Sequence, residues 1–166
     1  LGNFVNRALG FTKKAFDGKI PEIDSFDEKD SEAEKKIKSL ASEVGSLMEQ
    51  NHLDRALKKI MEFSSHFNQY FQHKEPWKKG PGTTNCVFLS VNAVRSLAVA
   101  IFPFMPESAQ KIWDQVDLDG DIADIPWSEI SNLGISSGHI LGEPSPLFAR
   151  VESTDIEEYK KQLSPS

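Results

Sequence analysis

Residues 87–102 of the 166-residue chain read VFLSVNAVRSLAVAIF, and Pro103 follows them. Apolar side chains would occupy most of the circumference of a helix formed by this stretch, with Asn92 and Arg95 as the main polar interruptions. A helix that is apolar on nearly every side is typical of the centre of a fold. We therefore expect a central, deeply buried helix here, capped at its start by Thr83 or Thr84 and ended by Pro103.

Four further segments repeat apolar residues at the spacing of three and four that is typical of amphipathic helices. Ser31, with Glu34 three residues later, fits a capping box and is the expected N-cap of the second segment. The four expected helices run from Leu1 to about Phe16, from Ser31 to about Gln50, from Leu53 to Pro76, and from Pro106 to about Val116.

The composition of the sequence changes from residue 122 onward, where Pro, Gly and Ser accompany scattered hydrophobic residues such as Trp127, Ile130 and Leu133. We interpret this part as a packed, irregular tail, followed by a short closing helix that Thr154 caps. The predicted fold is all-α, a bundle of about five main helices with an irregular C-terminal segment and the closing helix. A single domain over residues 1–166 is expected.

Composition limits the classes of function. The formal net charge of −6 argues against a protein that holds nucleic acid mainly by nonspecific electrostatics, so we expect no DNA partner. The longest apolar run, residues 97–104, is too short to span a bilayer, and we expect no membrane partner and a cytoplasmic location. The single cysteine, Cys86, lies on an apolar helical face and is expected to be a buried, inert thiol.

Signatures of catalysis and metal binding are absent from the sequence. The four histidines form no HExxH or similar set, and the DLDGD stretch at residues 117–121 would place Gln115 where a calcium loop requires a carboxylate. No GxSxG, Walker or GxGxxG stretch occurs. We expect neither a catalytic residue nor a metal or other cofactor in this chain.

The stretch YFQHKEPWKKGPG, from Tyr70 to Gly82, carries the first candidate binding residue, Trp77. A tryptophan directly after a proline at a helix end has its ring direction restricted by the backbone, which suits a platform for a stacked base. Lys78 and Lys79 beside it can hold phosphates, as can Lys13 and Lys14. The alternative is that Trp77 seals the end of the core.

Asn3 and Arg7 form the second candidate set. They lie four residues apart in the first expected helix and so project from one face. Stacking together with hydrogen bonds to base edges is how unstacked RNA bases are recognised. An ordinary solvated helix face explains the same spacing, and spacing alone does not bring Asn3 and Arg7 to Trp77.

Several stretches in this order resemble the anticodon-binding helical domain of methionyl-tRNA synthetases of the archaeal or eukaryote-like type. The resemblance covers nearly the whole chain, and the NxxxR helix together with the distant Pro-Trp element makes it specific. The stretches are LGNFVNRALGFTKKAFDG at residues 1–18, HKEPWKKG at 73–80, NAVRSLAVAIFPFMPESAQKIW at 92–113 and LGEPSPLFARVE at 141–152.

The resemblance implies a site for the CAU anticodon loop of tRNA(Met). Trp77 matches the residue that stacks on the first anticodon base, cytosine, and Asn3 and Arg7 match residues that make polar contacts with anticodon bases. Pro76 matches the proline that positions the ring. Gln72, His73 and Lys78 are possible supporting residues, and some bacterial members carry an acidic residue in place of Gln72.

The resemblance also implies a longer parent enzyme, since the chain opens on Leu1 inside a helical pattern and lacks the family's HIGH and KMSKS signatures. The catalytic domain of the same chain would attach methionine to tRNA(Met) with ATP, and the parent is expected to bind zinc. Two alternatives stay open: a helical protein-interaction or structural module, and the anticodon-binding bundle of another class I synthetase. A free-standing enzyme is disfavoured by the missing active site.

Overall fold

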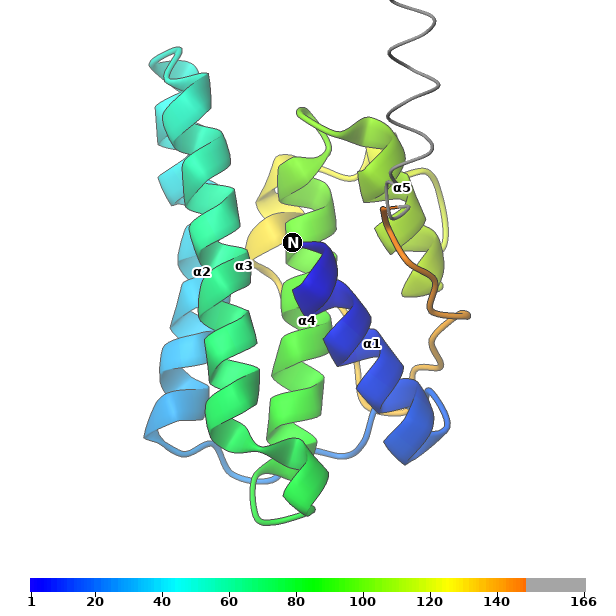
Figure 1. Ribbon diagram of the computed structural model, residues 1–166. Coiled ribbons are helices and arrows are strands. Elements are labelled where there is room, and N and C mark those ends of the chain that lie inside the picture. Colours follow the sequence, from blue (N-terminus) through cyan, green and yellow to red (C-terminus); the bar gives the residue numbers. More distant parts are fainter. Residues whose placement is uncertain (149–166) are drawn as a thin grey trace, which may run out of the picture.

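The central helix of the bundle is α4, Thr83–Ile101, and the other helices are arranged around it (Figure 1). The computed structural model describes residues 1–148. The elements besides α4 are α1 (Gly2–Phe16), α2 (Glu28–Glu49), α3 (Leu53–Lys74), α5 (Pro106–Gln115) and the 3-10 helices η1 (Pro76–Lys78), η2 (Ile122–Asp124) and η3 (Trp127–Ser131). Within this range the only β-type pairing is an isolated bridge between Lys19 and Ile140. The predicted all-α bundle of five main helices is confirmed.

The burial of α4 follows from its sequence. Every residue from Asn85 to Ile101 is buried, because α1, α2, α3, α5 and η3 all pack against this helix. By length and composition α4, which is much longer than the apolar run 97–104, could cross a membrane. However, 94% of its apolar window is buried inside the bundle, and a covered core helix meets the same criterion.

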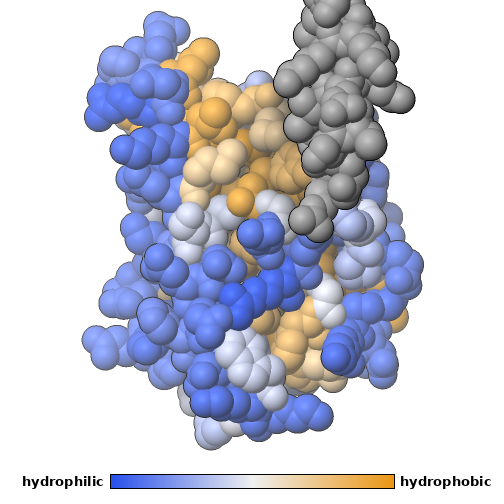
Figure 2. Space-filling view, viewed as in Figure 1, coloured by the Kyte–Doolittle hydropathy of each residue, from blue (hydrophilic) through white to orange (hydrophobic). Residues whose placement is uncertain are grey.

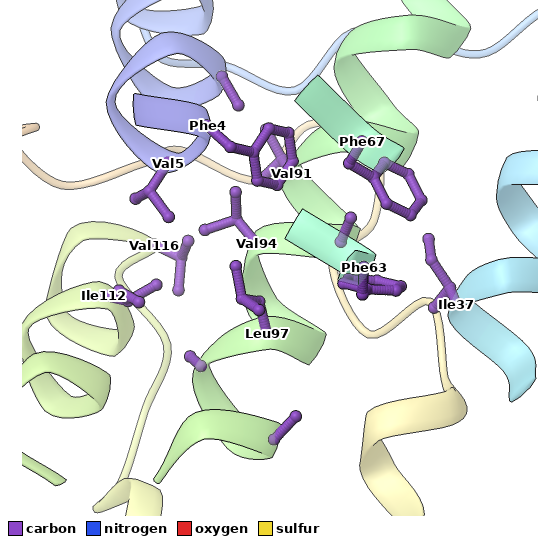
Figure 3. Close-up of a cluster of buried hydrophobic side chains, with 14 of the residues drawn as sticks. Phe4, Val5, Ile37, Phe63, Phe67, Val91, Val94, Leu97, Ile112 and Val116 are labelled. Atoms are coloured by element: carbon purple, nitrogen blue, oxygen red, sulfur yellow. The ribbon is translucent and has the colours of Figure 1, made fainter. Parts of the chain in front are cut away.

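Figure 3 shows how side chains of α1, α2, α3 and the α5 region meet those of α4. Aromatic rings make up much of this core: the ring centroids of Phe4 and Phe67 lie 5.9 Å apart, and those of Phe63 and Phe67 lie 4.8 Å apart. The pairing of Phe4 with Phe67 fixes α1 against α3. The labelled core residues are Phe4, Val5, Ile37, Phe63, Phe67, Val91, Val94, Leu97, Ile112 and Val116.

Two expected helix caps are wrong. The N-cap of α2 is Asp27 rather than Ser31: the Asp27 carboxylate accepts a bond from the Asp30 N–H at 2.9 Å, and the Asp30 carboxylate accepts one from the Asp27 N–H at 3.2 Å. This is a capping box made of two aspartates, which a search for Ser or Thr with a following Glu does not detect. At the start of α4, Gly82 is the N-cap with a φ of 79°, and neither threonine caps the helix.

The irregular segment after α5 packs onto the bundle, as expected. The Trp127 indole N–H donates to the Ala41 carbonyl at 2.9 Å, and Ile130 is fully buried. Asn92 bonds both the N–H and the carbonyl of Ile135, at 2.9 and 3.0 Å. The closing helix expected from Thr154 lies outside the described residues.

Candidate nucleic-acid interface

The backbone at the end of α3 turns Trp77 onto the surface. α3 ends at Lys74, Glu75 takes a left-handed conformation (φ 44°), and Pro76 begins η1. The residue before a proline is sterically disfavoured in the helical region, so the helix stops there. Pro76 is buried, whereas Trp77 remains 41% exposed. The Trp77 ring is therefore partly open to solvent, while it also lies against the buried Phe71 ring.

Arg7 lies beside this ring. Its guanidinium carbon is 5.3 Å from the centroid of the Trp77 ring and 5.3 Å from that of Phe71, and these two centroids are 6.4 Å apart. A guanidinium over aromatic faces is attracted by their negative π density. The contact is possible because α1 packs against α3. Arg7 and Trp77, 70 positions apart in sequence, thus form one surface above the buried Phe71 ring, and we call these three residues the aromatic platform.

Two amide side chains on α3 hold the Arg7 guanidinium in place. Asn68 accepts a hydrogen bond from it at 3.3 Å, and Gln72 accepts another through its side-chain oxygen. Both acceptors are neutral, so the positive charge of Arg7 is not neutralised by a carboxylate there. Gln72 thus belongs to the site as a support for Arg7. The sequence analysis did not identify Asn68, although its spacing of four from Gln72 puts both on one helix face.

The other residues expected from the sequence lie in several different places. Asn3 is exposed and stands one turn before Arg7 on α1. The Lys78 ammonium pairs with Glu75 at 2.7 Å, and Lys13 pairs with Glu143. His73 lines a different hollow, together with Lys29 and Tyr70 between α2 and α3, and is not part of the aromatic platform.

A buried polar cluster at the end of α3 was not expected from the sequence. The Asp30 carboxylate, 1% exposed, accepts bonds from the Tyr70 hydroxyl at 2.7 Å and the Asn85 amide at 3.0 Å. The Lys74 ammonium lies 2.7 Å from Asp30 and 2.7 Å from Asp27. We call these five residues the Asp30 cluster. It ties the start of α2 and the start of α4 to the end of α3. Trp77 follows that end in η1.

The protonation of the Asp30 cluster follows from its partners. Burial lowers the pKa of Lys74, but its hydrogen bonds to Asp27 and Asp30 outweigh burial and leave that pKa raised. The hydrogen bond from Lys74 lowers the pKa of Asp27. Burial raises the pKa of Tyr70, which keeps its hydroxyl protonated as the donor to Asp30. The ion pair of Lys74 with Asp27 therefore persists across the neutral range.

Cys86 lacks the surroundings that a reactive thiol requires. Cys86 is fully buried, as expected, and burial raises its pKa to about 12. A thiol of that pKa carries almost no thiolate at neutral pH, so it is a poor nucleophile. Within residues 1–148, no three His, Cys, Asp or Glu side chains are grouped in a way that could hold a metal ion.

Comparison with known proteins connects this geometry to one family. The family model described as the anticodon binding domain of methionyl tRNA ligase matches residues 20–166, so Trp77 falls inside the matched range and Asn3 and Arg7 precede it. The methionine–tRNA ligase of Pyrococcus abyssi is 38% identical over 94% of this chain, and that of Methanosphaera stadtmanae is 32% identical over 98%. The chain spans about a fifth of the first protein (21%) and about a quarter of the second (26%).

Solved structures give the same result. Mycobacterium tuberculosis methionyl-tRNA synthetase bound by methionyl-adenylate superposes with a TM-score of 0.77 and 25% identity, over 90% of this chain and 30% of that chain. Its apo form superposes with a TM-score of 0.78, over 92% of this chain and 32% of that chain. The chain described here therefore belongs to the family of anticodon-binding domains of methionyl-tRNA ligases.

Proposed function

We propose that this domain recognises the CAU anticodon loop of tRNA(Met) through the aromatic platform. The observation that carries the proposal is the exposed Trp77 ring with the Arg7 guanidinium 5.3 Å from its centroid. Anticodon bases stand unpaired in a loop, so they can be splayed out and stacked on an aromatic ring. Recognition of this kind needs little net positive charge, which fits a chain with a formal net charge of −6.

Each site residue has a distinct role in this proposal. Trp77 stacks on the first anticodon base, cytosine, and Pro76 fixes the ring direction. Asn3 and Arg7 form hydrogen bonds with base edges, and Gln72 keeps the guanidinium oriented. Lys78 follows Trp77 in the chain, and its ammonium exchanges Glu75 for a phosphate of the loop. Stacking contributes about 1–3 kcal/mol per base, and a good bidentate contact discriminates by a similar amount.

We further propose that residues 1–166 form one domain of a longer methionine–tRNA ligase. Its catalytic domain, in the same chain, would attach methionine to tRNA(Met) in the cytoplasm. The relative from Mycobacterium tuberculosis is bound by methionyl-adenylate, which fits an ATP-dependent reaction in the parent enzyme. ATP and the zinc expected for the parent belong to parts of the protein outside this chain.

The proposal is tested by fluorescence anisotropy with labelled anticodon stem-loops. The wild-type chain should bind a CAU loop at least tenfold more tightly than a loop with its cytosine changed to uracil. Trp77→Ala should weaken binding to the CAU loop about tenfold and reduce this preference. Leu53→Ala, which alters an exposed residue at the opposite end of α3, serves as the control and should leave both affinities unchanged. Equal affinity of the wild type for the two loops would refute the proposal.

A further inference from the structure

The loop that carries Trp77 contributes little to the core. It comprises residues 75–82 and connects the end of α3 to the start of α4 at the lower end of the bundle (Figure 1). Pro76 is the only buried residue of this loop. Figure 2 shows that the surface at this end of the molecule is largely hydrophilic. The place of Trp77 therefore depends on how the two ends of the loop are held.

Lys74, the last residue of α3, holds the first end of the loop. Its side chain is only 7% exposed, and its ammonium lies 2.7 Å from the carboxylates of both Asp27 and Asp30 at the start of α2. Displacement of this ammonium would break two ion pairs, one of them with a buried carboxylate, and is therefore costly. The end of α3 from which the loop departs is thus fixed to α2.

The same ammonium lies against the other end of the loop. Gly82 is the N-cap of α4, and a Cβ placed on it would lie 2.8 Å from the Lys74 Nζ and 3.3 Å from its Cε. The end of a lysine side chain normally moves away from such a contact, but here the two carboxylates hold it. Lys74 therefore contacts both ends of the loop that carries Trp77.

We propose that Lys74 is a positioning residue for anticodon recognition, which sets the place of the Trp77 ring without touching the RNA. This inference rests on the proposed function, in which the ring stacks on cytosine. Only Glu75 and Pro76 separate the two residues, and both have restricted backbones. Because the Lys74 ammonium is covered and already has two carboxylate partners, it is not available to a phosphate. Its effect on RNA binding passes through the loop.

The place of the ring matters because recognition needs Trp77 and Arg7 together. The Arg7 guanidinium lies 5.3 Å from the centroid of the Trp77 ring, but it is held by α3 side chains and not by the loop. A shift of the loop therefore moves the ring relative to the guanidinium. A displacement of about 1 Å is enough to disrupt a recognition geometry of this kind. A base stacked on a displaced ring no longer presents its edge to Arg7.

Lys74→Met tests the proposal, because methionine is of similar length and removes only the charged end of the side chain. The Asp30 carboxylate keeps the Tyr70 hydroxyl and the Asn85 amide as donors in this variant. Asp27→Asn is a milder change, which withdraws one charged partner of Lys74 and keeps a side chain that caps α2.

Lys38→Met is the matched control. Lys38 also pairs with a carboxylate, that of Glu34 at 2.8 Å, but on the exposed side of α2. The 166-residue chain carrying each change is titrated with the CAU stem-loop and with a loop whose cytosine is changed to uracil. Circular dichroism melting verifies that each variant is folded.

Lys74→Met should bind the CAU loop about tenfold more weakly and the uracil loop no more than about threefold more weakly, so that most of the preference for cytosine is lost. Asp27→Asn should show a smaller loss of the same kind, and Lys38→Met should show none. The NMR signal of the Trp77 indole N–H, identified by its absence from Trp77→Ala, should shift in Lys74→Met and stay in place in Lys38→Met. A purely structural role would lower the melting temperature and leave the preference unchanged.

Gly82→Ala tests the same contact from the other end of the loop. Its Cβ would displace the Lys74 ammonium, so we expect the preference for cytosine to fall as in Lys74→Met. Gly120→Ala is the control, because Gly120 has a similar φ of 86° but no atom within 4 Å of its Cβ position. It carries a similar backbone strain without the contact and should keep the preference. If Lys74→Met fails to fold, this pair decides, and an equal preference in both alanine variants overturns the inference.

Two results distinguish failure of this inference from failure of the proposed function. If Lys74→Met and Gly82→Ala keep the full preference for cytosine while Trp77→Ala loses it, Lys74 does not position the ring and the proposed function stands. If the wild type binds the two loops equally, the proposed function fails together with the inference.

Discussion

Two arginine–tryptophan pairs within residues 1–148 have similar geometry but differ in their exposure to solvent. The Arg7 guanidinium carbon lies 5.3 Å from the centroid of Trp77, and that of Arg95 lies 5.8 Å from the centroid of Trp113. Trp77 is 41% exposed, whereas Trp113 is 2% exposed. The same pairing of side chains is thus open to a ligand at one place and covered by the fold at the other.

The partners of the two guanidinium groups differ as well. Arg95 donates to the main-chain carbonyls of Glu129 and Asn132 at 2.7 and 3.3 Å, and it pairs with the Glu129 carboxylate at 3.1 Å. Arg7 donates to two side-chain amides on α3. Main-chain carbonyls of a packed segment cannot move aside, but amide side chains can. Arg95 therefore stabilises the fold, and Arg7 can exchange its partners for those of a ligand.

Truncation of the two tryptophans should give the largest difference between the pairs. Trp113→Ala should lower the free energy of unfolding by about 3–5 kcal/mol, because it leaves a cavity in the core. Trp77→Ala should lower it by no more than about 1 kcal/mol, since much of that ring already contacts water. Urea denaturation of both variants measures the difference. Equal losses would show that Trp77 is a core residue after all.

Replacement of the arginines by methionine should also lower the free energy of unfolding more for the Arg95 pair than for the Arg7 pair. The difference should be smaller than that between the two tryptophan variants. Loss of Arg95 leaves the carbonyls of Glu129 and Asn132 without their donor, which we expect to lower the free energy of unfolding by about 2–4 kcal/mol. Arg7→Met leaves only exchangeable amides behind, and a change within about 1 kcal/mol is expected. The same denaturation experiment tests this prediction. A loss above 2 kcal/mol for Arg7→Met would contradict the distinction between the pairs.

The surroundings of the covered pair, Arg95 and Trp113, could be predicted from the sequence better than those of the open pair, Arg7 and Trp77. The apolar circumference of residues 87–102 is a local property, so the burial of Arg95 in a central helix could be anticipated. The contact between Arg7 and Trp77 depends on how α1 packs against the end of α3, which helical spacing does not encode. Only the resemblance to a known family led us to expect it.

The Asp30 cluster near the open pair could not be predicted for a related reason. The Asp30 cluster joins three helix ends: Tyr70 bonds to a carboxylate 40 residues away, and Asn85 to the same one 55 residues away. The spacing of Tyr70 and Lys74 shows that they share a helix face, but not which partner that face meets. Asp30 precedes the helix start expected at Ser31, whereas α2 begins at Glu28 and includes Asp30 in its first turn.

Arg7→Lys tests whether the guanidinium shape matters at the open site. Lysine keeps the charge but loses the planar fork that bonds Asn68 and Gln72 and lies over the two rings. We expect binding of the CAU stem-loop to weaken about tenfold, with the free energy of unfolding changed by less than about 0.5 kcal/mol. Arg55→Lys, at an exposed arginine near the other end of α3, is the matched control for anisotropy measurements. Unchanged affinity for Arg7→Lys would reduce the role of Arg7 to that of a point charge.

Acid should loosen the open pair before the covered one, and this is the smallest effect. The folded-state pKa of Asp27 is lowered below its usual 3.8 by the hydrogen bond from Lys74, so its contribution to stability is present above pH 3.8 and is lost as the pH falls through the folded value. The Asp27 side chain is 57% exposed, which limits that contribution to less than about 1 kcal/mol.

The covered pair should respond less to acid, because two of the three hydrogen bonds of Arg95 go to main-chain carbonyls, which do not titrate. Below pH 3.8, hydrogen exchange of the Lys78 N–H, which donates to the Glu75 carbonyl at 2.9 Å in η1, should therefore accelerate more than that of the Trp113 N–H in α5. Asp27→Asn should remove much of this pH dependence, while Asp114→Asn, at an exposed residue of α5, should not. Equal acceleration at both amides would mean that the Asp30 cluster does not hold the aromatic platform independently of the core.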